Sequence, residues 1–149
     1  MRYILFQIIF FFAFLAMSSG VHAACSGSEL AGVWSNPNAG KEMPRRIEIM
    51  HTCEERDHGG YVSRGKSAQN ETWTVRAFHK CTPKNCVWGR VSARKNSKDE
   101  LIAVFNTFSA RRSLKISPGA KSIIVDYGID YRSARKNDLK GQLYMWLDQ

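Results

Sequence analysis

The sequence predicts an all-β protein, a single antiparallel meander closed into a small, disulfide-bonded barrel of about eight strands. Three observations predict it. Apolar residues recur with a period of two, in runs of about five to nine residues, which is the pattern of strands. Turn-forming residues separate the runs. All four cysteines lie beyond an apolar N-terminal segment, which is typical of an exported domain with disulfides.

The N-terminal segment has the layout of a secretory signal peptide. Arg2 precedes an uncharged apolar stretch over residues 3–17, and small residues then lead to Val21-His22-Ala23. A membrane span needs about 20 apolar residues, so this stretch is short for one. We expect cleavage after Ala23, with Ala24 as the second choice; an uncleaved anchor is the alternative.

The cleavage point raises a second alternative at Cys25. Bacterial lipoprotein signals end in a lipidated cysteine, but His22 stands where they have leucine, which disfavours lipidation. We therefore predict a signal peptide over residues 1–23, one β-barrel domain over residues 24–149, and a periplasmic or secreted location in a bacterium.

The charge balance suggests what the domain meets. The chain has 22 Lys and Arg against 13 Asp and Glu, a net charge of +9 that falls to +8 when Arg2 leaves with the signal peptide. A protein of this charge is drawn to anionic surfaces. For an exported protein we expect acidic glycans, phospholipid headgroups or an acidic protein rather than a specific nucleic acid. The alternative is that scattered basic residues only keep a small barrel soluble.

The strands follow from the alternation. Ile47 and Ile49 fall on one face of their run, and Trp73, Val75 and Ala77 share a face of theirs, which describes sheets with one buried side. Closing the meander removes both exposed edges. Only Ser26–Leu30 and Ala110–Ser113 look weakly helical. The predicted strands are Gly32–Asn36, Arg46–Cys53, Tyr61–Arg64, Thr72–Lys80, Val87–Ala93, Leu101–Ser109, Ser113–Ser117, Ser122–Tyr127 and Leu139–Leu147.

The segment Cys81-Thr82-Pro83-Lys84-Asn85-Cys86 has three interpretations. A zinc site is permitted by the spacing, and His79 adds a donor, but export favours oxidised cysteines and Lys84 is an unfavourable neighbour for a cation. A redox pair is normally Cys-x-x-Cys opening a helix. A disulfide-closed β turn fits best, because proline and asparagine suit its positions. We expect the disulfides Cys81–Cys86 and Cys25–Cys53, and no metal.

Two resemblances follow from these motifs. Gly32-Val33-Trp34 resembles the Gly-x-Trp that begins lipocalin and avidin barrels, and Asn36 matches an asparagine common in avidins. The resemblance implies a barrel of that type. Biotin binding is not carried over, because the later ligand-contacting residues of avidins have no match.

The second resemblance covers more of the chain. Cys81-x-Pro83-x-x-Cys86-x-Trp88-Gly89, between two strands, is similar to a segment of small exported bacterial proteins, largely uncharacterised. It implies a β-rich fold and no activity. These relatives often have acidic residues on both sides of the second cysteine, where this chain has Asn85 and Val87, so a function of those carboxylates is not implied.

Two sets of residues are candidates for binding. Aromatic rings line the cavities of ligand-binding barrels, and Trp88 stands out because strand parity places it opposite Val87, Gly89 and Val91. Basic residues interleaved with tyrosines can grip a polyanion. The candidate ligand-binding residues are Trp34, Trp73, Trp88, Phe105 and Trp146, and the candidate partner-binding residues are Lys84, Arg90, Arg111, Arg112, Arg132 and Arg135.

The sequence favours binding over catalysis. Glu54-Glu55 and Asp57-His58 lie in one loop, but no catalytic triad order, phosphate loop or cofactor motif stands out, so a hydrolase is a distant third hypothesis. We expect a non-catalytic exported binding protein without a cofactor, holding a small hydrophobic or aromatic ligand in the barrel mouth. The alternative is a protein-interaction module, such as an inhibitor or immunity-type protein, whose basic loops cover an acidic partner or polyanion.

Overall fold

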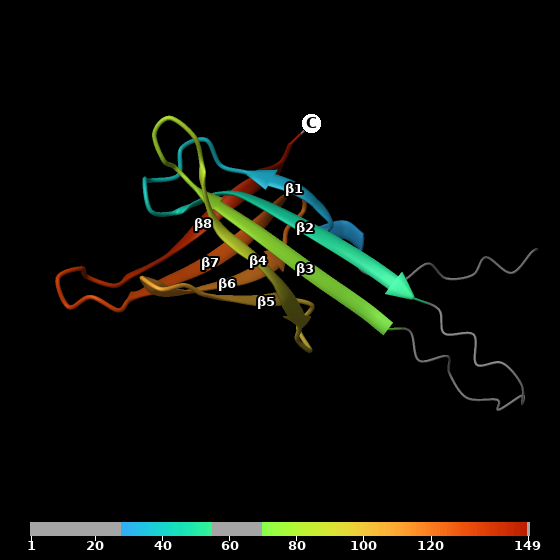
Figure 1. Cartoon of the computed structure of the whole chain (residues 1–149). Coiled ribbons are helices and arrows are strands. Elements are labelled where there is room, and N and C mark those ends of the chain that lie inside the picture. The colour runs from blue at the N-terminus through green and yellow to red at the C-terminus, as the bar shows by residue number, and fades with distance from the viewer. Residues whose placement is uncertain (1–27, 55–69, 149) are drawn as a thin grey trace, which may run out of the picture.

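The computed structural model describes residues 28–54 and 70–148 (Figure 1). The predicted signal peptide, Cys25, the predicted Tyr61–Arg64 strand and the Asp57-His58 pair lie outside the described residues. Among the described residues, no helix is long and apolar enough to cross a membrane.

Eight antiparallel strands in sequential order form a closed barrel, which confirms the predicted fold class. Each strand pairs with the next, and the first pairs with the last, so each described strand has a partner on both sides. A short 3-10 helix, η1 (Ser28–Leu30), precedes the sheet. The strands are β1 (Gly32–Ser35), β2 (Pro44–Glu54), β3 (Asn70–His79), β4 (Cys86–Lys95), β5 (Leu101–Asn106), β6 (Ala110–Pro118), β7 (Ser122–Tyr131) and β8 (Leu139–Leu147).

Alternation places every second side chain inside. Ile47 pairs with Ala77 and Ile49 with Val75, and all four are buried, as the pattern predicted. The interior is filled by one apolar cluster to which all eight strands contribute. The predicted weak helix Ala110–Ser113 is wrong: these residues open β6, because they pair with β5 and β7 on both sides.

A bulge in β4 reverses the parity expected for Trp88. The β3–β4 register shifts between Ala77, which pairs with Gly89, and Phe78, which pairs with Val87, so Trp88 is an extra residue. Gly89 has φ of 128°, a conformation that favours glycine. The bulge turns Trp88 into the barrel, where it is 4% exposed, while Val87 on the outer wall is 48% exposed.

The closure between β1 and β8 is short and is completed by side chains. Only Trp34–Leu147 and Ser35–Trp146 pair across it. Asn36 adds to the closure, because its side-chain nitrogen donates to the Tyr144 carbonyl at 2.9 Å. Asn36 is therefore one of the contacts across this closure, together with the Asp148 backbone N–H, which donates to the Val33 carbonyl at 2.7 Å.

Candidate functional site

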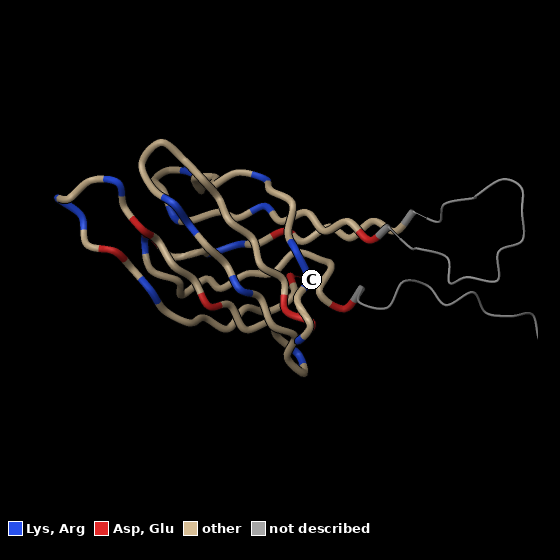
Figure 2. Tube along the Cα trace, turned by 90° about the horizontal axis from the view of Figure 1, so that it is seen from below, with Lys and Arg blue, Asp and Glu red and all other residues tan. Residues whose placement is uncertain are grey.

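The two ends of the barrel differ in charge. Four loops, residues 36–43, 80–85, 107–109 and 132–138, lie at one end, on the left in Figure 1. We call this the basic end, and Figure 2 shows its basic residues along the loops. It carries Lys41, Lys80, Lys84, Arg132, Arg135 and Lys136 against Glu42 and Asp138.

The opposite end is formed, among the described residues, by η1, residues 96–100, residues 119–121 and Asp148. Its acidic groups outnumber its basic ones. Two residues there are basic, Lys98 and Lys121, and four are acidic, namely Glu29, Asp99, Glu100 and Asp148. The interior is covered there by η1, because Trp34 Nε1 donates to the Leu30 carbonyl at 2.9 Å and Leu30 is buried.

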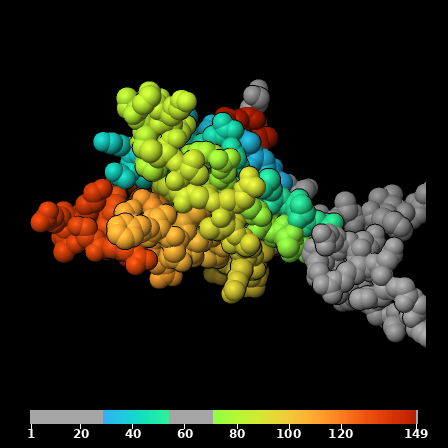
Figure 3. All heavy atoms as spheres, in the orientation of Figure 1, coloured from blue at the N-terminus to red at the C-terminus, as the bar shows by residue number. Residues whose placement is uncertain are grey.

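An open pocket of about 920 Å³ lies at the basic end, between the β5–β6 turn and the β7–β8 loop. These two segments, orange and red-orange, project side by side in Figure 3. The pocket has aromatic walls and a basic rim, and no acidic residue lines it. Its lining includes Phe108, Tyr131, Arg132, Arg135 and Lys136.

Phe108 is held at the tip of a tight turn. The Thr107 backbone N–H donates to the Ala110 carbonyl at 3.0 Å, and the Thr107 hydroxyl donates to the same carbonyl at 2.9 Å. The Arg132 backbone N–H donates to the Ser109 carbonyl at 3.0 Å, which ties the turn to the β7–β8 loop. Phe108 is nevertheless 100% exposed. The fold therefore presents an aromatic ring to solvent on a fixed support.

Tyr131 forms the other wall of the pocket. The contacts beside it link residues 132–138 to residues 36–43. Lys136 Nζ lies 4.8 Å from the centre of the Tyr131 ring and 3.9 Å from Glu42 Oε1. Burial, together with the charge of Glu42 and a hydrogen bond to it, raises the pKa of Tyr131, so its hydroxyl stays protonated at neutral pH. The pocket wall is thus a neutral ring beside the Lys136–Glu42 ion pair.

Beneath this surface, strands β4 and β5 diverge. They pair only at Arg94–Ile102 and Lys95–Leu101, toward the opposite end. Toward the basic end the space is filled by Trp88 and Phe105, whose rings meet edge to face at 5.8 Å. Side chains rather than backbone hydrogen bonds close the barrel here.

The same region contains buried nitrogen atoms without a hydrogen-bond partner among the described residues. Arg112 is 8% exposed, its guanidinium lies 5.4 Å from the centre of the Trp88 ring, and its Nη1 donates to the Thr107 hydroxyl at 2.8 Å. Its Nε, Trp88 Nε1 and His79 Nδ1 are buried without a hydrogen bond. Such groups reduce stability unless water or a ligand meets them, so the basic end is less well satisfied than an ordinary core.

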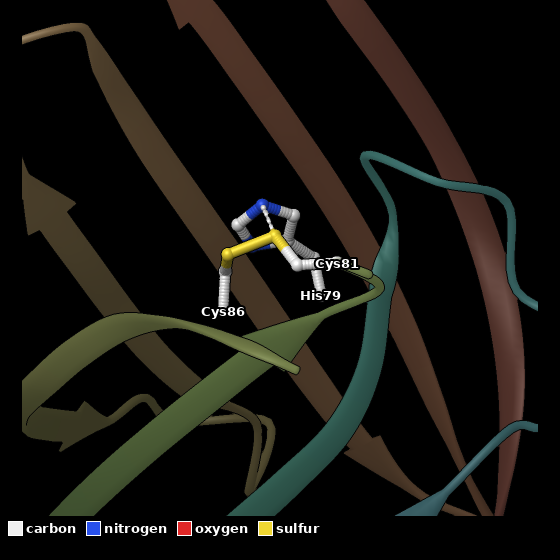
Figure 4. A group of neighbouring side chains, drawn as sticks. All are labelled: His79, Cys81 and Cys86. Atoms are coloured by element: carbon white, nitrogen blue, oxygen red, sulfur yellow. Dashed lines mark hydrogen bonds between the residues drawn. A yellow bond between two sulfur atoms is a disulfide. The ribbon is translucent and has the colours of Figure 1, made fainter. Parts of the chain in front are cut away.

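The predicted Cys81–Cys86 disulfide is present, with a Cα–Cα distance of 5.4 Å. It closes the turn from β3 to β4, and the His79 imidazole lies against it, with Nε2 3.7 Å from Cys81 Sγ (Figure 4). Burial and the nearby Arg112 lower the pKa of His79, although Glu42 opposes them, so the imidazole is neutral at pH 7. The second predicted pair, Cys25–Cys53, stays a prediction because Cys25 lies outside the described residues.

The structure separates the candidate ligand-binding residues. Trp34, Trp73, Trp88 and Phe105 are buried in the interior cluster. Trp73 stacks on His51 with ring centres 4.0 Å apart. Trp146 is 51% exposed on β8. These side chains are not brought together around a shared opening; four of them fill the barrel.

More of the candidate partner-binding residues than of the candidate ligand-binding residues are exposed on the surface. Lys84, Arg132 and Arg135 are exposed in loops of the basic end. Arg111 is exposed on β6 and pairs with Asn106, the last residue of β5. Arg90 is exposed on the outer wall of β4, while Arg112 is buried against Trp88.

Sequence reasoning missed Phe108, Tyr131 and Lys136 as members of one site. A signal for Phe108 existed: Phe105 and Phe108 are three residues apart, so a regular strand cannot place both inside. The predicted strand Leu101–Ser109 was too long and included Phe108. In the structure β5 ends at Asn106, and Phe108 lies in the turn that follows. Nothing in the sequence around Tyr131 and Lys136 indicates that these two residues lie near Phe108.

The comparisons with known proteins add no relative. No family model, no curated protein and no solved structure matches this chain. The site therefore has to be interpreted from its own geometry.

Proposed function

We propose that the protein is a non-catalytic binding module that holds an acidic protein partner at the basic end of its barrel. An apolar side chain of the partner sits between Phe108 and Tyr131, and carboxylates beside it meet Arg132, Arg135 and Lys136. This is the protein-interaction module that the sequence analysis gave as the alternative, with the pocket at the basic end as its proposed binding site.

One observation carries the proposal: a fully exposed phenylalanine borders a pocket that has a basic rim and no acidic lining. Phe108 does not stand alone, because it lines one pocket with Tyr131 and the basic residues of the rim, and an exposed apolar patch with a polar rim is typical of interaction surfaces. Aromatic and arginine side chains are also those that dominate binding energy at interfaces. The charge of the rim selects an acidic partner and speeds its approach.

The filled interior favours a partner over a small ligand in the barrel mouth. Four of the five aromatic residues considered for such a ligand pack against one another and against aliphatic neighbours in the core. Making room for a ligand among them would require breaking that packing. The surface pocket needs no such rearrangement.

The test uses short fluorescent peptides rich in glutamate with one central phenylalanine. Matched peptides replace either the glutamates by glutamine or the phenylalanine by serine, and binding is measured by fluorescence anisotropy. We expect the glutamate and phenylalanine peptide to bind best, and about 0.3 M NaCl to weaken it by screening.

Two variants and one control test whether the peptide binds at this pocket. Arg132→Glu with Arg135→Glu should weaken binding by about tenfold or more, and Phe108→Ser should abolish the preference for the phenylalanine peptide. Lys98→Glu with Lys121→Glu makes the same charge change with exposed residues of the opposite end and should change binding little. Equal losses in both double variants would show that net charge alone acts.

Two other anionic probes distinguish the class of partner. Heparin and phosphatidylserine vesicles are titrated under the same conditions. Binding of either probe, lost in Arg132→Glu with Arg135→Glu, together with no binding of any peptide, overturns the protein partner in favour of a polyanion or a lipid surface.

A further inference from the structure

The turn that joins β3 and β4 places two sulfurs and an imidazole together. The ligand atoms offered by His79, Cys81 and Cys86 lie within 4.8 Å of one another, and Figure 4 shows the imidazole ring against the sulfur of Cys81. Two sulfurs and one nitrogen are a donor set that Zn²⁺ prefers. In the disulfide, however, neither sulfur is a thiolate, so the set is incomplete.

The sheet, and not only the disulfide, holds these residues near one another. His79 is the last residue of β3, Cys86 is the first residue of β4, and the two are cross-strand partners. Cys81 follows His79 by two residues within the same turn. Cutting the sulfur–sulfur bond therefore leaves three donors anchored at the end of a paired hairpin.

We infer that the reduced β3–β4 turn binds one thiophilic divalent cation such as Zn²⁺ through Cys81, Cys86 and His79. The cation and the disulfide exclude each other, so this turn is a redox-gated metal site. It is separate from the pocket at Phe108, and its test needs no acidic partner.

The chemistry balances with a dithiol as the reductant. The disulfide takes two electrons and two protons from the dithiol, which becomes a disulfide itself, and Cys81 and Cys86 become thiols. The cation then displaces both thiol protons to solvent as the sulfurs bind, while neutral His79 donates a nitrogen lone pair. Two thiolate charges neutralise the cation, and water completes a tetrahedral shell.

The surroundings permit both steps. Cys81 and Cys86 are partly exposed, so a reductant reaches them. Lys80 and Lys84 are exposed, so solvent screens their charges from the cation. His79 Nε2 lies 3.7 Å from Cys81 Sγ, so the imidazole already presents a nitrogen toward the two sulfurs.

The experiment compares oxidised and reduced protein, with Co²⁺ as the spectroscopic probe and Zn²⁺ as the competitor. The reduced protein should bind one Co²⁺ with thiolate-to-metal absorption in the near ultraviolet, and Zn²⁺ should displace it. The oxidised protein should show no such band. Absence of the band in the reduced protein, or the same band in the oxidised protein, overturns the inference.

Variants separate this turn from the other cysteines. Cys81→Ser with Cys86→Ser keeps Cys25 and Cys53 and should lose the band after reduction; a band that persists there assigns the binding elsewhere. His79→Gln keeps both thiols. Since losing even a hydrogen bond to a ligand costs about 10- to 100-fold in affinity, losing the ligand itself should cost at least about tenfold and alter the spectrum.

The control for His79→Gln is His51→Gln, which changes a histidine of β2 that stacks on Trp73. It should leave the Co²⁺ band unchanged. Equal affinity and identical spectra for wild type and His79→Gln would remove the imidazole from the site and overturn the inference. Circular dichroism and tryptophan fluorescence of each reduced variant check that the barrel is intact.

Discussion

The two ends of the barrel are built from the same strands but meet solvent in different ways. Toward the opposite end Trp34 donates to Leu30 and Glu100 accepts hydrogen bonds from Asn96 and Ser117, but Trp73 Nε1 and His51 Nε2 are buried without a partner among the described residues. At the basic end a phenylalanine is fully exposed, and Trp88 and Arg112 bury donors without partners among the described residues.

The difference between the two ends indicates which of them is the better candidate for a binding site. A core gains stability when apolar groups are buried and polar groups are satisfied. What distinguishes the basic end is that a fully exposed ring, Phe108, and the unpaired nitrogens of Trp88 and Arg112 lie within one short region. Departures from folding rules that gather in one place are expected at functional sites. The predictions below test whether the two ends differ as described.

The largest expected effect is the difference between two phenylalanine variants of the basic end. Phe105→Ala removes a buried ring from the β4–β5 junction and should cost about 3–5 kcal/mol of unfolding free energy. Phe108→Ala removes an exposed ring and should change stability by less than about 0.5 kcal/mol. Urea unfolding measures both. A large loss in Phe108→Ala would mean that its ring supports the fold and would weaken the proposed site.

Two tryptophans compare the ends directly. Trp34→Phe leaves the Leu30 carbonyl without its donor, which should cost about 1–3 kcal/mol. Trp88→Phe removes a donor that has no partner among residues 28–54 and 70–148, so it should cost less than Trp34→Phe by about 1 kcal/mol or more. Denaturant unfolding of the two variants gives the difference. Equal losses would show that Trp88 Nε1 is satisfied by water in solution.

Arg112→Met tests the buried charge at the basic end. The guanidinium has no acidic partner among the described ion pairs. Because an apolar side chain of similar length avoids the cost of desolvating a charge, the variant should differ from wild type by no more than about 1 kcal/mol. Thermal and urea unfolding check this. A loss beyond about 3 kcal/mol would show that the hydrogen bond to Thr107 and the contact with Trp88 hold the barrel together.

The smallest effect should come from Glu100 at the opposite end. Hydrogen bonds from Asn96 and Ser117 and the charge of Lys115 lower the pKa of Glu100, although desolvation opposes them. A lowered pKa in the folded state means stabilisation at neutral pH that is lost as pH falls below about 4.5 through the folded value.

Glu100→Gln should therefore flatten the acid limb of the stability curve and lower stability slightly at neutral pH. Thermal midpoints between about pH 3 and 6 measure it. An unchanged acid limb would mean that other carboxyl groups set the acid sensitivity.

Much of the fold could be predicted from local pattern. The Leu139–Leu147 strand was predicted with both ends correct, and the faces containing Ile47 and Trp73 were confirmed. The Cys81–Cys86 disulfide was also confirmed. These features depend on alternation or on a short loop, so neighbouring residues are enough to specify them.

The sequence by itself determined the barrel class, the alternation of its strands and the disulfide-closed turn, because these follow from periods of two and from loop lengths. Only the tertiary structure decided that Trp88 faces inward and that Phe108 and Tyr131 wall one pocket. The first depends on a bulge whose register is set against β3. The second depends on barrel closure, which brings together loops that are more than 20 residues apart in the chain.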